Sequence, residues 1–428
     1  MESSQHIISI VKGEENIAQM KKENNKIHPR DKQNETRNII HSVKVGVSLV
    51  LVSLMYLLNP LFHQVGENAM WAIMTVIVIF EFSPGATLGK GLNRGMGTIV
   101  GGGLGCLAAF FAHNIIGGVG NSVIIGIFVY ICGTVGTYFR LLPKVKQRYE
   151  YGVVTLMLTF NLVMMYGVRA NEKVWEIARQ RLLSIVMGFI VCICVSLFIF
   201  PLWASDELHH STVSTFHDLA NTIQGCLEEN GILVSENESQ LIAGFTLCNS
   251  VLNSKSKDEL LANSARWEPW HGKFGFCYPW ENYLKIGNVL RELATFVLAV
   301  GHSLQSSKQD MASLRQTHLE QFETCEAIGS RVAWALRELG DSMKQMKKCE
   351  DNKGSSILAK LKECREELSL VISTSKVAIL ENGQVLAISS LVFLLMKVVD
   401  KVEELVKEVE ELGQIAAFPT NITIPLSS

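Results

Sequence analysis

Six apolar stretches without charged residues dominate residues 43–204 and limit what this chain can fold into. They cover residues 45–66, 68–80, 95–116, 121–139, 151–168 and 182–204. Most of them reach the roughly 18 residues that a membrane-spanning helix needs. The second stretch is interrupted by Glu81 and extends past it to Gly89; Pro84 follows, so we expect that helix to end or bend near Glu81. The pattern predicts an all-α integral membrane domain with six transmembrane helices.

Basic residues between these stretches predict how the domain is oriented. Cytosolic loops carry an excess of Lys and Arg. The N-terminal tail is basic, and we assign Lys90 and Arg94 to a loop between spans two and three. A third basic loop, between spans four and five, contains Arg140, Lys144, Lys146 and Arg148. Residues 59–70 and 113–120 contain no Lys or Arg. We therefore expect the N- and C-termini to be cytosolic.

The net charge of −2 hides a separation of charge along the chain. Residues 43–202 sum to +6 and residues 203–428 sum to −9. We expect a cytosolic tail over residues 1–42, a transmembrane domain over 43–204, a cytosolic helical domain over 205–415 and a loose tail over 416–428. A near-neutral total gives no sign of a nucleic-acid partner.

The acidic half has a helical pattern. Residues 385–396 are apolar but too few to span a membrane, so they are interpreted as the start of a buried helix. That helix continues with apolar residues at i, i+3 and i+4, which favours packing in a core over a dimeric coiled coil: Val398, Val399, Val402, Leu405, Val406, Val409 and Leu412. Residues 267–286, rich in aromatic residues, Pro and Gly, are interpreted as an ordered connector or, alternatively, a regulatory contact.

Ionisable groups at membrane depth are the candidate functional residues. Lys44 enters the first apolar run, and Arg179 and Arg181 lie against the sixth. Such residues usually face a bundle interior or an aqueous path, and a basic interior would attract anions. Snorkelling to the interface is the alternative. Glu81 is a candidate polar group within the membrane, either paired with a basic residue or acting as a proton relay.

Glycine spacing predicts close helix packing. Gly97, Gly101 and Gly105 recur every four residues within the third stretch. Small residues at this spacing let helix backbones approach one another closely. The glycines of residues 89–95 do not have the spacing of a dinucleotide-binding motif.

Enzyme, metal and cofactor functions are not indicated. His209, His210 and His217 lie close together in sequence, but no further ligand is placed convincingly, so we predict no metal site. No nucleophile–base pattern and no phosphate loop is present in the sequence. We therefore expect neither catalysis nor a cofactor.

Several strings together resemble the plant aluminium-activated malate transporter family. They are WAIMTVIVIFEF at 71–82, GATLGKGLNRG at 85–95, YEYG at 149–152, FPLWA at 200–204 and WEPWHGKF at 267–274. They run in the family's order from about residue 41 to residue 293. The resemblance implies a homodimeric anion channel in the lipid bilayer, with six membrane helices and a helical cytosolic domain.

The resemblance also implies roles for single residues. Lys44 matches a basic residue linked to conduction, and Arg181 matches the central pore arginine. With the neighbouring Arg179 and Arg169 they form the predicted anion pathway. Two carboxylates match an acidic gate at the outer mouth: Glu172 and Glu176. A third acidic position of aluminium-responsive members is His63 here, which predicts weak or absent aluminium activation, because a hard trivalent ion prefers carboxylate oxygen.

The resulting prediction is a channel for passive transport of malate and of anions such as chloride or nitrate. The alternative is a proton-coupled exporter of organic anions. The plasma membrane is preferred over the vacuolar membrane as its location.

Overall fold

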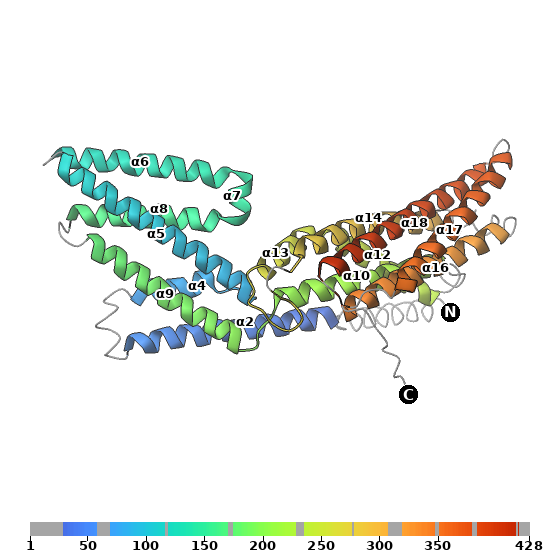
Figure 1. The fold of residues 1–428 in the computed structure, drawn as a ribbon, viewed down its shortest axis with the longest axis horizontal. Coiled ribbons are helices and arrows are strands. Elements are labelled where there is room, and N and C mark those ends of the chain that lie inside the picture. Colours follow the sequence, from blue (N-terminus) through green and yellow to red (C-terminus); the bar gives the residue numbers. More distant parts are fainter. Residues whose placement is uncertain are drawn as a thin grey trace, which may run out of the picture. The chain divides into compact units, whose positions relative to one another are not determined.

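The computed structural model describes residues 29–57, 69–115, 119–169, 174–227, 235–275, 278–306, 319–346, 351–378, 383–416 and 418. The chain divides into two compact units, Met1–Leu202 and Trp203–Ser428, called here the membrane unit and the C-terminal unit (Figure 1). Helices account for the regular structure of the described residues, which include one isolated β-bridge and no strand. The predicted all-α class is therefore confirmed.

The membrane unit contains helices at all six predicted apolar stretches. They are α2 (Pro29–Leu57), α4 (Ala69–Ile79), α5 (Pro84–Ile115), α6 (Val119–Leu141), α8 (Glu150–Arg169) and α9 (Val174–Phe198), with the short α7 (Pro143–Arg148) before α8. Four of these described helices, α2, α5, α6 and α9, are long and apolar enough to cross a membrane. Helix α4 has 11 residues and rises only about 16 Å.

The boundary between α4 and α5 confirms one prediction and contradicts another. Helix α4 ends at Ile79, so the expected end of that helix near Glu81 is confirmed, and the second apolar stretch does not continue as one helix to Gly89. Pro84 starts α5, where its missing N–H costs nothing, and the Ser83 hydroxyl accepts the backbone N–H of Ala86 at 3.2 Å. The assignment of Lys90 and Arg94 to a loop is therefore wrong. Both lie inside α5.

Two other helices begin earlier than their apolar stretches. Helix α2 begins at Pro29, within the predicted N-terminal tail. Helix α9 begins at Val174 and ends at Phe198, whereas the sixth apolar stretch covers residues 182–204. In both helices the charged residues belong to the same helix as the apolar run, because helix formation does not stop where hydropathy falls.

The glycine prediction is confirmed by the contact between α5 and α8. A Cβ added at Gly97 would lie 2.3 Å from the backbone oxygen of Gly152, and one at Gly101 would lie 2.4 Å from that of Leu156. No side chain fits at these distances. The two backbones therefore touch, and only glycine allows this packing.

The C-terminal unit is a set of helices around one apolar core. Its helices are α10 (Ala204–Leu227), α12 (Ser235–Leu252), α13 (Lys255–Ala265), α14 (Trp280–Ser306), α16 (Leu319–Gln345), α17 (Asp351–Ala378) and α18 (Gly383–Ile415). The predicted buried helix is α18, and its apolar residues from Val398 to Leu412 are at most 4% exposed. This confirms core packing for that segment. Helix α14 begins at Trp280, so the last part of the predicted connector 267–286 is helical.

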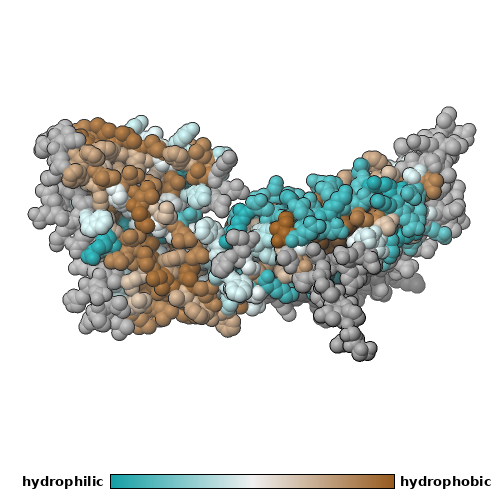
Figure 2. Space-filling view, in the orientation of Figure 1, coloured by the Kyte–Doolittle hydropathy of each residue, from teal (hydrophilic) through white to brown (hydrophobic). Residues whose placement is uncertain are grey.

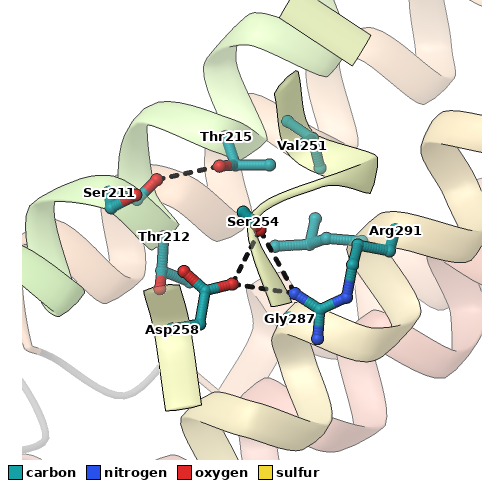
Figure 3. A pocket seen from close by; sticks show the side chains of 9 residues that line it. Ser211, Thr212, Thr215, Val251, Ser254, Asp258, Gly287 and Arg291 are labelled. Carbon is teal, nitrogen blue, oxygen red and sulfur yellow. Dashed lines mark hydrogen bonds and ion pairs between the residues drawn. The ribbon is translucent and has the colours of Figure 1, made fainter. Parts of the chain in front are cut away.

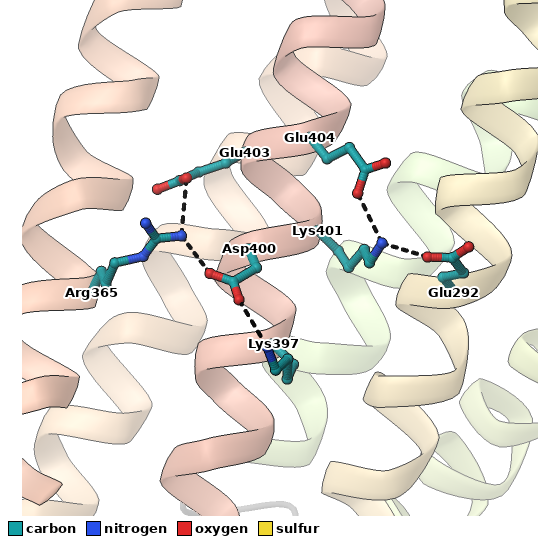
Figure 4. A network of polar contacts seen from close by, with 7 residues as sticks. All are labelled: Glu292, Arg365, Lys397, Asp400, Lys401, Glu403 and Glu404. Atoms are coloured by element: carbon teal, nitrogen blue, oxygen red, sulfur yellow. Dashed lines mark hydrogen bonds and ion pairs between the residues drawn. The ribbon is translucent and has the colours of Figure 1, made fainter.

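Ion pairs on the surface of this unit connect its long helices (Figure 4). Arg365 of α17 pairs with Asp400 and, at 3.1 Å, with Glu403 of α18. Lys401 of α18 pairs with Glu292 of α14. Exposed pairs of this kind contribute about 0–1 kcal/mol each, so the apolar core provides most of the stability.

The two units differ in the character of their surfaces. Apolar residues cover much of the visible face of the membrane unit, whereas polar residues cover that of the C-terminal unit (Figure 2). Large apolar side chains such as Phe110, Tyr130 and Leu141 are 63–74% exposed in the membrane unit. A surface of this kind fits a lipid environment.

Candidate functional site

Three cationic side chains are buried inside the membrane unit. Lys44 of α2 is 1% exposed, Arg94 of α5 is 7% exposed and Arg181 of α9 is 3% exposed. Burying a charge is costly unless a partner compensates for it. The contacts of these three groups therefore indicate what the interior is built to hold.

Arg181 stacks on an aromatic ring, and two of its nitrogen atoms have no described hydrogen-bond partner. Its guanidinium carbon lies 3.9 Å from the centroid of the Trp71 ring of α4. This cation–π contact orients the planar group. Its Nε and Nη1 atoms are buried and have no hydrogen-bond partner among the described residues.

Arg94 is held by α8. Its Nη1 donates a hydrogen bond to the hydroxyl of Tyr151, and its buried Nε has no described partner. Arg94 on α5 and Arg181 on α9 are both buried cations, and their helices pack against each other. Two like charges held together in a low-dielectric interior attract an anion more strongly than either does alone.

Lys44 lies on α2, which packs against α4 and α9. Its ammonium nitrogen is buried and has no partner among the described residues. Its backbone oxygen accepts the Ser48 hydroxyl at 2.9 Å, which is a local helical contact. The three cations lie on three helices. Tyr151 accepts one donor of Arg94, and other buried donors of the three side chains have no acceptor among the described residues.

The described carboxylates of residues 43–202 do not pair with these cations. Among residues 43–202, the described carboxylate side chains are Glu81 and Glu150. Glu81 pairs with Lys90, and Glu150 accepts from Arg140 at 2.8 Å. Both pairs are partly exposed, and their partners are not the buried cations. The buried donors therefore suit an anion that enters from outside the protein.

The remaining predicted site residues are distributed differently. Arg179 is exposed on α9, two residues from Arg181, so the helix turns it away from the buried guanidinium. Arg169 ends α8, and Glu176 lies on α9; their side chains are outside the described part of the structure. Glu172 and His63 also lie outside the described residues.

Sequence reasoning missed Arg94. Lys90 and Arg94 lower the hydropathy of the first part of α5, so the hydropathy pattern placed both residues in a loop. The signal that could have found it is Pro84 preceded by Ser83, a helix start ten residues before Arg94.

The C-terminal unit contains a buried histidine, a half-buried histidine and a small polar cavity. His209 contacts the Tyr283 hydroxyl at 2.8 Å, and His217 lies 3.5 Å from Asp341, so both have protein partners. A cavity of about 20 Å³, large enough for one or two waters, lies beside the ion pair of Asp258 and Arg291 (Figure 3). These groups stabilise the unit.

The chain is similar to known proteins of one family. The family described as "Aluminium activated malate transporter" matches residues 32–382. Aluminum-activated malate transporter 2 of Arabidopsis thaliana is 35% identical over 391 residues, which are 90% of this chain and 76% of that protein. Transporter 12 of the same plant is 40% identical over 74% of this chain and 56% of its own length. Transporter 1 of Triticum aestivum is 31% identical over 90% of this chain and 83% of its own.

The chain thus spans about three quarters of some of these relatives and little more than half of others. The family match covers both the membrane unit and most of the C-terminal unit. Together with the apolar helices, it makes the protein a multi-pass membrane protein. The chain belongs to the aluminium-activated malate transporter family.

Proposed function

We propose that this protein is a homodimeric channel that conducts malate, and anions such as chloride or nitrate, passively across the plasma membrane. The observation that carries the proposal is the set of buried cations, Lys44, Arg94 and Arg181, each of which has at least one buried donor without an acceptor among the described residues. Relatives that carry the name malate transporter support malate as the organic anion.

The chemistry of malate suits these groups. Its two carboxylates accept charge-assisted hydrogen bonds, which are about twice as strong as neutral ones. A guanidinium held by a ring, as Arg181 is by Trp71, keeps its donors oriented while water is removed from the anion. Because Arg94 and Arg181 are both buried cations, a passing anion is attracted by both.

In this proposal six helices, α2, α4, α5, α6, α8 and α9, cross the membrane and both termini are cytosolic. The basic residues around α7 support that orientation. Helix α4 is too short to cross alone, so it would cross together with the residues around it. Glu172 and Glu176 would form the acidic outer mouth.

Patch-clamp recording tests the proposal with a matched pair of variants. Arg181→Glu should abolish the malate current, because it places a negative charge where the anion passes. Arg179→Glu, with the same charge change on the exposed side of α9, should keep most of it. Wild-type-like current in Arg181→Glu, with the protein at the membrane, would refute the assignment.

A second variant tests the residue that the sequence did not reveal. Arg94→Gln keeps hydrogen-bonding ability but removes the charge, so we expect malate current to fall at least tenfold, as expected for about 1.4 kcal/mol or more of lost attraction. Lys90→Gln, one turn earlier on α5 and paired with Glu81, is the control and should change the current much less.

The ion gradients distinguish a channel from the proton-coupled exporter. A reversal potential that follows the malate gradient and ignores pH supports the channel, whereas a shift with pH supports coupling. Glu81 pairs with Lys90 and not with the buried cations, which does not favour a relay role. Addition of aluminium ions should leave the current unchanged, and His63→Glu tests whether the missing carboxylate is the reason.

A further inference from the structure

A loop of the C-terminal unit has one side fixed to a helix and the other side exposed. This segment, residues 266–275, lies between α13 and α14 and is called here the tryptophan loop. Glu268 and Phe274 are buried, at 8% and 4% exposure. Trp270 is 72% exposed and Trp267 is 39% exposed, and Lys273 is exposed beside them. One side of the loop is therefore packed within the unit, and the other side faces outward.

The buried side holds the start of α10. The Glu268 carboxylate accepts the backbone N–H groups of Ala204 at 2.6 Å and Ser205 at 3.1 Å. It also accepts the Ser205 hydroxyl at 2.6 Å. These N–H groups belong to a first helical turn, where no intrahelical acceptor exists and where negative charge is favoured. The carboxylate thus caps α10 from 64 residues away.

Ring stacking and a tight turn complete the attachment. The rings of Trp203 and His271 stack with centroids 3.6 Å apart. The backbone N–H of Phe274 donates to His271 at 3.1 Å, and Gly272 between them has a φ of 51°. That left-handed conformation favours glycine, so the turn can fold back and keep the loop against α10.

Chain connectivity keeps this loop near the membrane. The most apolar of the candidate membrane spans ends at Phe198 of α9, and α10 begins at Ala204. Five residues connect them, so the capped end of α10 lies within about 20 Å of the end of the span. Because Glu268 contacts Ala204 directly, the same limit applies closely to the tryptophan loop.

The exposed side of the loop has the chemistry of the headgroup layer. Tryptophan is enriched there because its ring is apolar and its N–H remains hydrogen-bonded. A ring that is 72% exposed to water leaves most of its apolar surface uncovered. Lys273 adds a positive charge, which anionic headgroups attract.

We propose that the tryptophan loop inserts into the headgroup layer of the bilayer, with Trp270 as the main anchor. Trp267 and Lys273 flank it. Through Glu268, the loop then fixes the start of α10 at the membrane surface. The proposal depends on α9 as a membrane span and not on anion conduction.

Fluorescence quenching in reconstituted full-length protein tests this. Vesicles contain phosphatidylcholine brominated either near the headgroup or deep in the acyl chain, and iodide serves as the aqueous quencher. Subtracting the spectrum of Trp270→Phe from that of the wild type isolates the emission of Trp270. Trp334→Phe on α16 isolates a tryptophan of 37% exposure away from the loop as a control.

We expect the Trp270 emission to be quenched at least twofold by shallow brominated lipid and little by iodide. Trp334 should show no lipid quenching. Quenching of Trp270 by iodide alone would show a water-facing loop, and quenching by neither would show that protein covers it, as in a contact with a second copy. Either result would overturn the proposal. Trp270 is mostly exposed, so its replacement by Phe should leave the fold intact, which circular dichroism checks.

Discussion

His209 makes the stability of the C-terminal unit depend on pH. Its ring is 6% exposed, lies 2.8 Å from the Tyr283 hydroxyl and packs against Phe274. Burial, with smaller contributions from the charges of His210 and Lys273, lowers the pKa of His209 to about 4 from 6.5. The folded protein therefore keeps this histidine neutral across the physiological range.

The sign of the effect follows from which state binds the proton first. As pH falls below about 6.5, the unfolded chain gains a proton on His209 and the folded chain does not. Acid therefore stabilises the unfolded state, and the loss is complete near pH 4. A shift of this size corresponds to about 3 kcal/mol in total, of which about 2 kcal/mol is lost by pH 5.

Urea unfolding of the full-length protein in detergent, followed by tryptophan fluorescence, measures this loss. Between pH 8 and pH 5, the free energy of unfolding of the wild type should fall by about 2 kcal/mol more than that of His209→Phe. The exposed neighbour provides a control, because His210→Gln should keep most of the wild-type dependence, since burial is the main cause of the lowered pKa of His209. Equal pH dependence in wild type and His209→Phe would show that His209 is not the responsible group.

Two further predictions concern packing and a half-buried ion pair. Gly101→Ala should destabilise the membrane unit by about 1–3 kcal/mol, because the new methyl group meets the backbone of α8, whereas Gly103→Ala has open space. Thermal denaturation in detergent measures both, and equal melting temperatures would contradict the contact. Asp258→Asn should cost about 2 kcal/mol, because it weakens a 2.8 Å pair with Arg291, whereas Glu281→Gln, at an exposed carboxylate, should cost less than about 1 kcal/mol. Similar urea midpoints for these two variants would show that burial does not strengthen the Asp258 pair.

Sequence patterns within a single helix predicted the features of the fold that a single helix determines. The periodic apolar residues of α18 identified a buried helix, and the glycines of α5 identified a close contact. The start of α5 was missed because hydropathy treats Lys90 and Arg94 as loop residues, while helix formation depends on caps such as Ser83. In the sequence, a charged residue inside a helix bundle cannot be distinguished from a charged residue in a loop. Its burial is known only when the packing of the helices is known.

Long-range contacts could not be predicted at all. Glu268 caps a helix that begins 64 residues earlier, and no local spacing marks that relationship. The stacking of Arg181 on Trp71 joins α9 to α4 in the same way. Of the residues predicted for the anion pathway, Lys44 and Arg181 are buried and Arg179 is exposed; their role in conduction stays a prediction.

The glycine contacts divide four helices of the membrane unit into two tightly packed pairs. Gly97 and Gly101 lock α5 to α8 backbone against backbone, and a Cβ at Gly188 of α9 would lie 2.8 Å from the backbone oxygen of Ala72 of α4, which locks that pair. Between the pairs, the tight contact is Gly91 against the ring of Phe189, and a ring can rotate where a backbone cannot. Arg94 lies on the first pair, in α5, and Arg181 on the second, in α9. A small hinge movement between them would change the separation of the two guanidinium groups, and with it the depth of the electrostatic well that an anion meets.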